Sequence, residues 1–369
     1  MIIDALEHHK KRAGTTGSLA YALKFRVAVR GSFQHRLLMT PGLELVLNTG
    51  GSYMLKQIYV IDLVVDELEA VKPDFDRLFG TEPLIIEPGM APGMEINAMY
   101  YQMPGDGAGI HAIGIFDRSG DGPKDVPTGA FLVGILCDDV DASVDEIRAR
   151  GINFAYPTQQ SYAVGRNNIT ESLNGVSFSI AQHNEDGYRS GQAMMKTKAG
   201  SPDFGDPSQG GMLKQLYVFD IIVHDLDDAI KNYKALFGVD PIDTSSITGS
   251  DGEVRSVHFP APGDGAGIHS VGLFQLTTDN PKSESGKKLK KALDTRGEGI
   301  FLIGFLVDDI DKAQDTLEAR GFDFITKEKT EYRMGRGNTI SNIHGTDYWF
   351  AQHHEQAYGD YRKMEAEPV

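Results

Sequence analysis

The sequence predicts an α+β fold built from four copies of a strand–helix–strand–strand–strand module, two in each homologous half. Two observations carry this prediction: long segments recur at constant spacing, and each half shows the module pattern twice. A length of 369 residues fits two domains. The composition, 40% hydrophobic and 24% charged, is that of a globular protein and not of a fibrous or disordered one.

The first strand and the Gly-rich turn of the two halves recur at one offset. Residues 54–62 are repeated with conservative changes as 212–220, and residues 104–111 are repeated without change as 262–269, both 158 positions later. We interpret the turn as a tight hairpin and not as a phosphate cradle, because it precedes a strand and no helix N-terminus would face an anion.

Later segments recur at a longer offset. Residues 165–166 return as 335–336, and residues 181–183 return as 351–353, both 170 positions later. The 12 extra residues therefore fall between residues 269 and 300, where the Lys- and Ser-rich run 279–291 predicts an exposed loop.

The repeat sets the predicted domain limits. They are a basic N-terminal extension at 1–53, a first domain at 54–196, a linker rich in Gly, Ser, Pro and Asp at 197–211, a second domain at 212–360, and a tail at 361–369. The extension holds seven Lys or Arg and three Asp or Glu, whereas the rest of the chain is strongly acidic. It is either a loosely ordered segment from an early start codon or a basic docking arm.

The first module of the first half begins with the β-branched and aromatic run 57–65, which predicts a strand. Leu68, Val71, Phe75 and Leu78 follow at helical spacing, and Gly80 stands just past the helix end. Three strands follow, around 84–86, 96–103 and 110–116.

The second module repeats this order. It has a strand at 131–137, a helix at 139–150 that ends before Gly151, and a last strand at 176–182. The second half has the corresponding helices at 225–237 and 309–320.

This four-fold pattern resembles the vicinal oxygen chelate superfamily, which includes glyoxalases, bleomycin resistance proteins and extradiol dioxygenases. The local signatures are Leu78-Phe79-Gly80, Leu236-Phe237-Gly238, Ala149-Arg150-Gly151 and Ala319-Arg320-Gly321, each after its module's first strand and helix. The resemblance covers about 54–355 and implies two open glyoxalase-like barrels, each formed by two modules.

The resemblance also implies a divalent metal such as Fe, Mn, Zn or Ni, held by side chains on the first and last strands of each module. Carried onto this chain, those ligand positions hold no metal-binding side chain; they are Val60, Leu132, Ser179, Val218, Leu302 and Trp349. The standard metal set is therefore absent or relocated. Trp349, in place of Ser179, would narrow the second cavity, so if one half is active and the other structural, the first half is expected to hold the roomier site.

A relocated set is present in both halves. Asp62, His111 and His183 form one candidate metal site, and Asp220, His269 and His353 form its copy. Asp62 and Asp220 interrupt apolar strands, so each is either a hydrogen-bonded structural residue or a catalytic group with a raised pKa. We predict that Asp62 pairs with His111, and Asp220 with His269, as catalytic residues.

A second shared pattern lies before the last strand. Tyr162, Arg166 and Asn168 match Tyr332, Arg336 and Asn338. An arginine can bind a carboxylate or phenolate with two hydrogen bonds, so these residues are candidates for substrate binding. The alternative is a surface loop held by Arg–backbone hydrogen bonds.

Charge and cysteine content exclude several classes of protein. A net charge of −16 disfavours nucleic acid, and no apolar run reaches the roughly 20 residues of a membrane helix. One cysteine and no evident signal peptide suggest a cytoplasmic protein. We expect it to be a monomer or a homodimer. Its partner would be a small molecule. Two functions stay open: dioxygenase, lyase or isomerase chemistry on a small oxygenated substrate, or metal-free sequestration as in bleomycin resistance.

Overall fold

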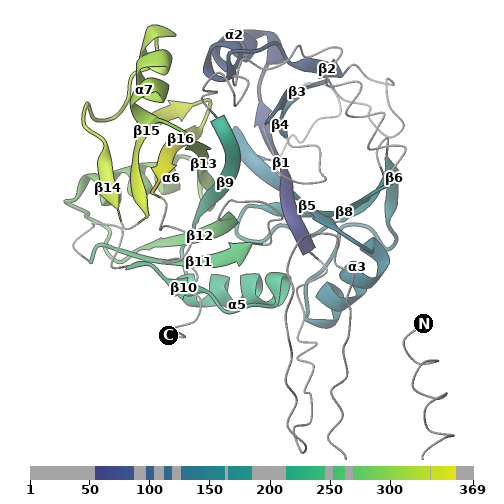
Figure 1. The fold of residues 1–369 in the computed structure, drawn as a ribbon. Helices are drawn as coiled ribbons and strands as arrows, with labels where there is room; N and C mark the ends of the chain where they lie inside the picture. The colour runs from purple at the N-terminus through teal and green to yellow at the C-terminus, as the bar shows by residue number, and fades with distance from the viewer. Residues whose placement is uncertain are drawn as a thin grey trace, which may run out of the picture. The chain divides into compact units, whose positions relative to one another are not determined.

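A computed structural model describes residues 55–86, 97–103, 112–118, 126–162, 165–184, 213–245, 252–261, 269–332 and 334–354. The expected extension at 1–53 and the linker lie outside these ranges, so the domain limits stay a prediction. The described chain forms two eight-stranded mixed sheets with the order of elements repeated between them. The predicted fold class is confirmed (Figure 1).

The first half has the following elements: β1 (Leu55–Val65), α2 (Leu68–Phe79), β2 (Leu84–Ile86), β3 (Ala98–Gln102), β4 (Ala112–Asp117), β5 (Gly129–Cys137), α3 (Val140–Ala149), β6 (Gln160–Tyr162), β7 (Gly165–Ile169) and β8 (Ser177–His183). The strand order is β2-β3-β4-β1-β5-β8-β7-β6. The first strands of the two modules, β1 and β5, pair antiparallel at the centre, and each pairs in parallel with the last strand of its own module.

The second half has β9 (Leu213–Ile222), α5 (Leu226–Phe237), β10 (Ile242–Asp243), β11 (Val254–Ala261), β12 (His269–Leu276), α6 (Glu284–Arg296), β13 (Gly299–Val307), α7 (Ile310–Ala319), β14 (Thr330–Tyr332), β15 (Gly335–Ile343) and β16 (Thr346–His353). Its order, β10-β11-β12-β9-β13-β16-β15-β14, is that of the first sheet.

One hydrophobic core, the shared core, lies between the two halves. It contains buried strand residues of both sheets and the apolar faces of α2, α3, α5 and α7. Aromatic rings cross from one half to the other: Phe178 packs against Phe219 and Phe237 at centroid distances of 6.4 and 6.0 Å, and Phe79 packs against Phe305 at 6.1 Å. Each sheet therefore has one face in the shared core, and we call the opposite face, which carries Asp62 or Asp220, the cavity face.

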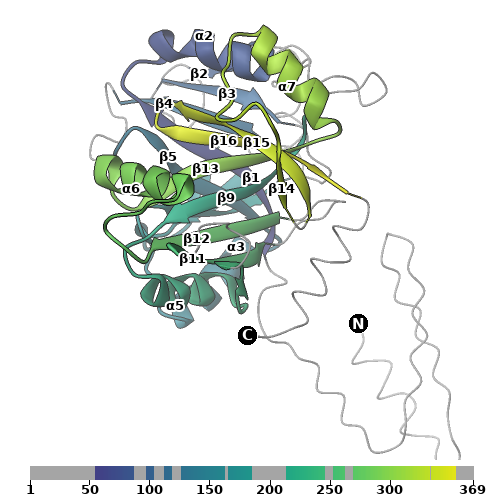
Figure 2. The same ribbon diagram turned by 90° about the vertical axis from the view of Figure 1, so that its left-hand side faces the viewer.

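The helices of the two halves meet in pairs at opposite ends of the molecule, α2 with α7 and α3 with α5 (Figures 1 and 2). The guanidinium of Arg150 donates to the carbonyl oxygens of Ala235 and Leu236 at 3.0 and 3.2 Å, at the C-terminal end of α5. Arg320 lies in the same way against Gly80, which ends α2 with a φ of 67°. A cation at a helix C-terminus satisfies free carbonyls and complements the helix dipole.

The 12-residue insertion of the second half forms a helix, so the expected exposed loop at 279–291 is wrong. The side chain of Ser283 caps α6 by accepting from the amide of Gly286 at 3.1 Å. Glu253 holds this cap, because its carboxylate accepts from the amides of Lys282 and Ser283 at 2.8 Å each. The helix packs against β9, β12 and β13 (Figure 2).

Candidate functional site

An aspartate lies at the centre of each cavity face, opposite a glycine of the neighbouring parallel strand. Asp62 of β1 pairs with Gly114 of β4, and Asp220 of β9 pairs with Gly272 of β12. A Cβ atom on either glycine would lie 2.2 Å from the Oδ1 atom of the aspartate. The two glycines therefore leave the space that the carboxylates occupy.

The first sheet surrounds its aspartate with aromatic and apolar side chains. Asp62 is 7% exposed, and its Oδ1 atom has no hydrogen-bond partner among the described residues. Burial raises the pKa of Asp62 to about 8, because the charged form loses its hydration. Tyr100 of β3 lies over the same glycine, and its pKa is raised well above the usual value, first by burial and then by Asp62.

The second sheet differs at this point, because His258 stands where the first sheet has Tyr100, 158 residues earlier. The Nε2 atom of His258 lies 3.5 Å from Oδ1 of Asp220. Its Nδ1 atom lies 2.9 Å from Oγ1 of Thr244, which is 2.8 Å from Oγ of Ser256. Hydrogen bonds join Ser256, Thr244 and His258, whereas Oδ1 of Asp220 is buried beside the imidazole with no hydrogen-bond partner among the described residues. We call these four side chains the polar chain.

The sequence signal for the polar chain is a difference between the halves. The predicted site residues are polar residues shared by both halves, whereas Thr244 and Ser256 are polar only in the second half and His258 replaces a tyrosine. The first half has Tyr100, Ile86 and Ala98 at the corresponding positions.

A cavity of about 390 Å³ opens on the cavity face of the second sheet. Its lining residues are Tyr217, Val218, Asp220, Thr244, Val254, His258, Ser270, Phe274, Ser285, Lys288, Leu289, Phe301, Leu302, Thr330, Tyr332, Met334, Thr339, Asp347 and Trp349. Ten of the nineteen are apolar, Tyr or Trp, and three members of the polar chain, Asp220, Thr244 and His258, are among the rest. A cavity of this size and character suits a small organic molecule.

Trp349 lines this cavity and does not close it. Its ring occupies space beside Gly337, where a Cβ atom would lie 2.3 Å from Cζ2 of the indole. The indole Nε1 donates to the hydroxyl of Tyr217 at 2.8 Å. The first sheet has Ser179 and Asn167 at the two corresponding positions, joined by a hydrogen bond of 2.9 Å. The wide indole is thus accommodated by the loss of a side chain opposite.

His183 and His353 lie at the ends of β8 and β16, each beside two tyrosines. The ring of His353 contacts Tyr217 and Tyr332 edge-on at 5.1 and 6.1 Å, and His183 contacts Tyr59 and Tyr162 in the same way. Burial lowers the pKa of each histidine to about 4. Both rings are therefore uncharged at neutral pH.

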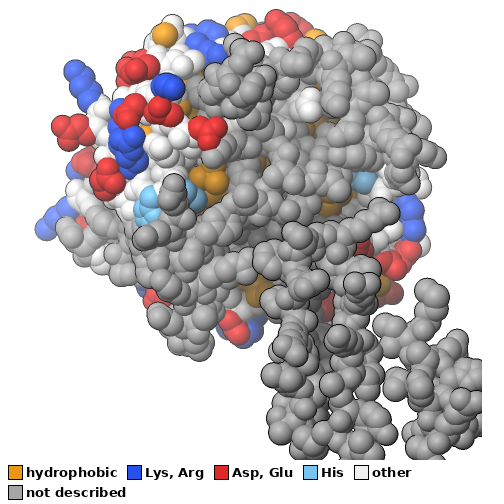
Figure 3. Space-filling model, viewed as in Figure 1, with side chains coloured by type: hydrophobic (Ala, Val, Ile, Leu, Met, Phe, Trp, Pro, Cys, Tyr) orange, Lys and Arg blue, Asp and Glu red, His pale blue; other side chains and the backbone are white. Residues whose placement is uncertain are grey.

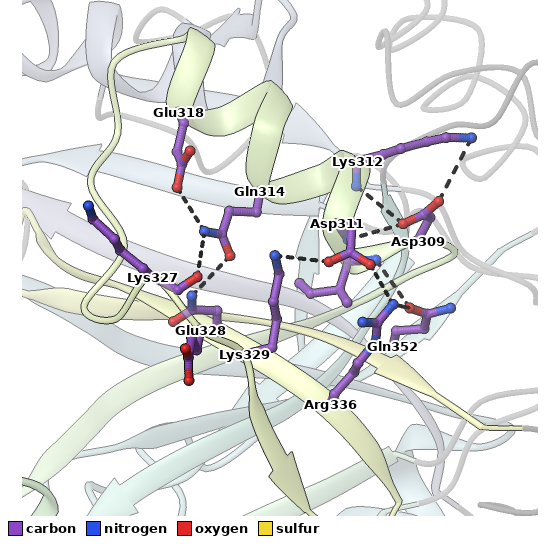
Figure 4. A network of polar contacts seen from close by, with 12 residues as sticks. Asp309, Asp311, Lys312, Gln314, Glu318, Lys327, Glu328, Lys329, Arg336 and Gln352 are labelled. Atoms are coloured by element: carbon purple, nitrogen blue, oxygen red, sulfur yellow. Dashed lines mark hydrogen bonds and ion pairs between the residues drawn. The ribbon is translucent and has the colours of Figure 1, made fainter.

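The predicted loop residues mostly make structural contacts. In the second half, Arg336 donates to Oδ2 of Asp311 at 2.6 Å and to Oε1 of Gln352 at 3.2 Å, and Lys329 binds the other oxygen of Asp311 (Figure 4). This network ties β15 to the first turn of α7. Acidic and basic side chains are interspersed on this side of the molecule (Figure 3).

Arg166 makes the equivalent pair with Asp141 at 2.7 Å. The buried amides of Asn168 and Asn338 donate to the backbone carbonyls of Tyr156 and Thr326. Of the six predicted substrate-binding residues, Tyr332 lines the second cavity, and Tyr162 packs at the edge of the corresponding apolar cluster on the first sheet. A ligand role for the others stays a prediction.

The two predicted Asp–His pairs are not tested. His111 lies outside the described residues, and so does the side chain of His269, whose backbone pairs with Ala261 in β12. On the described part of β12, Gly272 pairs with Asp220 of β9, and Ser270 pairs with Val218. The metal roles of Asp62, His183, Asp220 and His353 likewise remain predictions.

The described side chains do not fit a divalent metal at the usual place. Val218, Leu302 and Trp349 line the second cavity where the superfamily has ligands, and none of them can coordinate a metal. No group of three or more His, Cys, Asp or Glu able to hold a metal occurs among the described residues. We therefore derive no chemical step through a metal.

Comparison with known proteins agrees with the fold. Residues 219–339 match the family described as Glyoxalase/Bleomycin resistance protein/Dioxygenase superfamily. The resemblance to this superfamily is confirmed. No curated protein matches the chain. None of the described helices is long and apolar enough to cross a membrane.

Several solved structures of the superfamily share the fold at low sequence identity. A triple mutant of 4-hydroxymandelate synthase from Streptomyces coelicolor is 12% identical, with a TM-score of 0.58 over 81% of this chain and 93% of that one. The Mn(II)-bound glyoxalase from Novosphingobium aromaticivorans is 12% identical, with a TM-score of 0.53 over 81% and 82%. BphC, a halotolerant catechol dioxygenase, is 13% identical, with a TM-score of 0.50 over 82% and 88%. At such identity these likenesses concern the fold alone.

Proposed function

We propose that the cavity of the second sheet binds a small oxygenated aromatic molecule and that His258, assisted by Asp220, moves a proton on it. The observation that carries this proposal is the polar chain, which opens into a cavity with aromatic walls. The chemistry would be of the isomerase or lyase type.

The polar chain supplies the parts that a general base needs. When Nδ1 of His258 donates its proton to Thr244, the Nε2 atom is left unprotonated beside Asp220, where both residues line the cavity. Nε2 can then take a proton from an acidic C–H or O–H of the ligand and return it to another atom of the same molecule. The carboxylate of Asp220 would stabilise the imidazolium formed in between.

Hydrogen exchange of an aromatic 2-oxo acid tests this proposal. Phenylpyruvate carries an acidic C–H group, and its loss of proton signal in D₂O can be followed by NMR. We expect exchange above the uncatalysed rate with the wild-type chain, and a loss of about 100-fold or more in His258→Gln, a typical contribution of a general base. Asp220→Asn should lower the rate as well.

Asp315→Asn is the control, because it removes an exposed carboxylate of the second half that does not line the cavity. It should exchange phenylpyruvate at the wild-type rate. If His258→Gln and Asp315→Asn lose equal activity, or if His258→Gln loses none, the proton-transfer role of the polar chain is wrong.

The second candidate function is sequestration without chemistry. The apolar walls favour it, because they can hold a ligand whether or not the polar chain reacts with it. Binding of phenylpyruvate with no exchange above background in the wild-type chain would select this function. Trp349 is the only tryptophan of the chain, so its emission reports directly on occupancy of the second cavity.

A further inference from the structure

The inserted helix α6 places three side chains in the second cavity. Ser285, Lys288 and Leu289 line it, at the spacing of one helix face. Gly286 and Leu289 of the helix are buried, and Glu253 accepts hydrogen bonds at the N-terminal cap. The helix is therefore fixed both along its buried face and at its first turn. The insertion has no counterpart in the first half, and it therefore distinguishes the two cavity faces.

Lys288 is the one Lys or Arg side chain among the residues that line this cavity. Its neighbours on the outer face of α6 form ion pairs, Lys287 with Glu284 at 2.8 Å and Lys290 with Asp294 at 2.6 Å. Lys288 has no such ion pair with any described residue. Lys288 is exposed, and partial desolvation lowers its pKa, although Asp347 and Glu284 act in the opposite direction.

The nearby acid of the cavity, Asp347, is already engaged. Its Oδ1 atom accepts hydrogen bonds from the hydroxyl of Ser341 and the amide of Asn342, at 3.2 and 2.7 Å. Lys288 therefore lines the cavity with no ion-pair partner among the described residues, and ten of the other lining residues are apolar, Tyr or Trp. In a chain of net charge −16, this cation is the feature of the cavity that would attract an anion.

We infer that Lys288 binds the anionic group of the ligand, so that the second cavity selects small aromatic anions, such as aryl carboxylates, over neutral analogues. This inference rests on the proposed function and adds a specificity residue to it. The anionic group would lie at α6, the ring between the aromatic walls, and the reacting oxygen-bearing carbon toward the polar chain. Lys288 contacts the ligand and takes no part in moving the proton.

Two ligands of the same shape and different charge test this inference. Phenylpyruvate carries a carboxylate where phenylacetone carries a methyl group, and the ring and ketone are shared. We expect calorimetry at low salt to give a Kd for phenylpyruvate about twofold to fivefold below that for phenylacetone, the size of an exposed ion pair. Raising the ionic strength should reduce this preference.

Lys288→Ala should abolish the preference, and Lys288→Arg should retain most of it. Lys287→Ala is the control, because it removes a lysine of the same helix whose ion pair points away from the cavity. Preference kept in Lys288→Ala, or lost equally in Lys287→Ala, would overturn the inference.

The two proposals fail in different ways. If the preference is insensitive to Lys288 while His258→Gln still abolishes exchange, the role of Lys288 is wrong and the proton-transfer function stands. If neither ligand binds to the wild-type chain, both proposals are overturned.

Discussion

Replacing Asp62 by asparagine should stabilise the protein at alkaline pH and flatten the dependence of its stability on pH. Burial raises the pKa of Asp62 from 3.8 to about 8 in the folded chain. At about 1.4 kcal/mol for each pH unit between the two values, burial of the ionised form costs on the order of 5 kcal/mol. Asparagine has the shape of the protonated acid and never ionises.

The sign follows from proton binding. Between about pH 4 and pH 8 the folded chain holds a proton on Asp62 that the unfolded chain has released. The stability that this proton contributes is fully present below about pH 4 and is lost as the pH rises through 8. The variant should therefore match the wild type near pH 4 and exceed it by up to about 5 kcal/mol near pH 9.

Urea denaturation at a series of pH values measures this difference. Asp315→Asn is the control, because Asp315 lies on the exposed face of α7 and its removal leaves the cavity faces unchanged. A gain below about 1 kcal/mol at pH 9, or an unchanged slope against pH, would contradict the burial of an unpaired carboxylate at this site.

Three further changes follow from contacts described above. Arg150→Met removes two hydrogen bonds to the last carbonyls of α5 and should lower the free energy of unfolding by about 1–2 kcal/mol. The control Arg255→Met, at an exposed ion pair, should change the free energy of unfolding by less than about 0.5 kcal/mol. Equal losses in the two variants would refute the capping role of Arg150. Gly337→Ala should displace the indole of Trp349 and shift its emission, and an unshifted spectrum would show that the space beside the ring is not needed. His353→Phe should make the chain less sensitive to acid. The uncharged histidine contributes stability that is present above about pH 6.5 and is lost as the pH falls through about 4. This contribution to the free energy of unfolding is at most about 3 kcal/mol, and unchanged acid denaturation would argue against burial of the ring.

The repeat, the order of the modules and the helix ends could be predicted because their signals are local. Gly80 and Gly238 end α2 and α5 with positive φ, as the residues past the helical spacing indicated. The helix α6 was missed because the run 279–291, in which it begins, is rich in lysine and serine, and only Gly286 and Leu289 of the helix become buried. Its cap depends on Glu253, about thirty positions earlier, a contact that composition does not show.

The candidate site was predicted in part. Asp62 and Asp220 stood out as polar residues within apolar strands, and both lie on a cavity face. The surroundings of the two aspartates could not be predicted from the sequence, because Gly114 and Gly272 lie opposite them only through the parallel pairing of distant strands. His258 escaped notice for the opposite reason: it marks a difference between the halves, and strand pairing brings it to Asp220.

Each half contributes one arginine that contacts a helix end of the other half, and this reciprocity bears on the origin of the two-domain chain. Arg150 of the first half reaches Gly238 of the second, and Arg320 of the second reaches Gly80 of the first. This reciprocal contact is that of an isologous dimer, here made within one chain by two fused copies. Gene fusion frees such copies from having to stay identical. One copy could then acquire α6 and the polar chain, while the other kept the packing that both require.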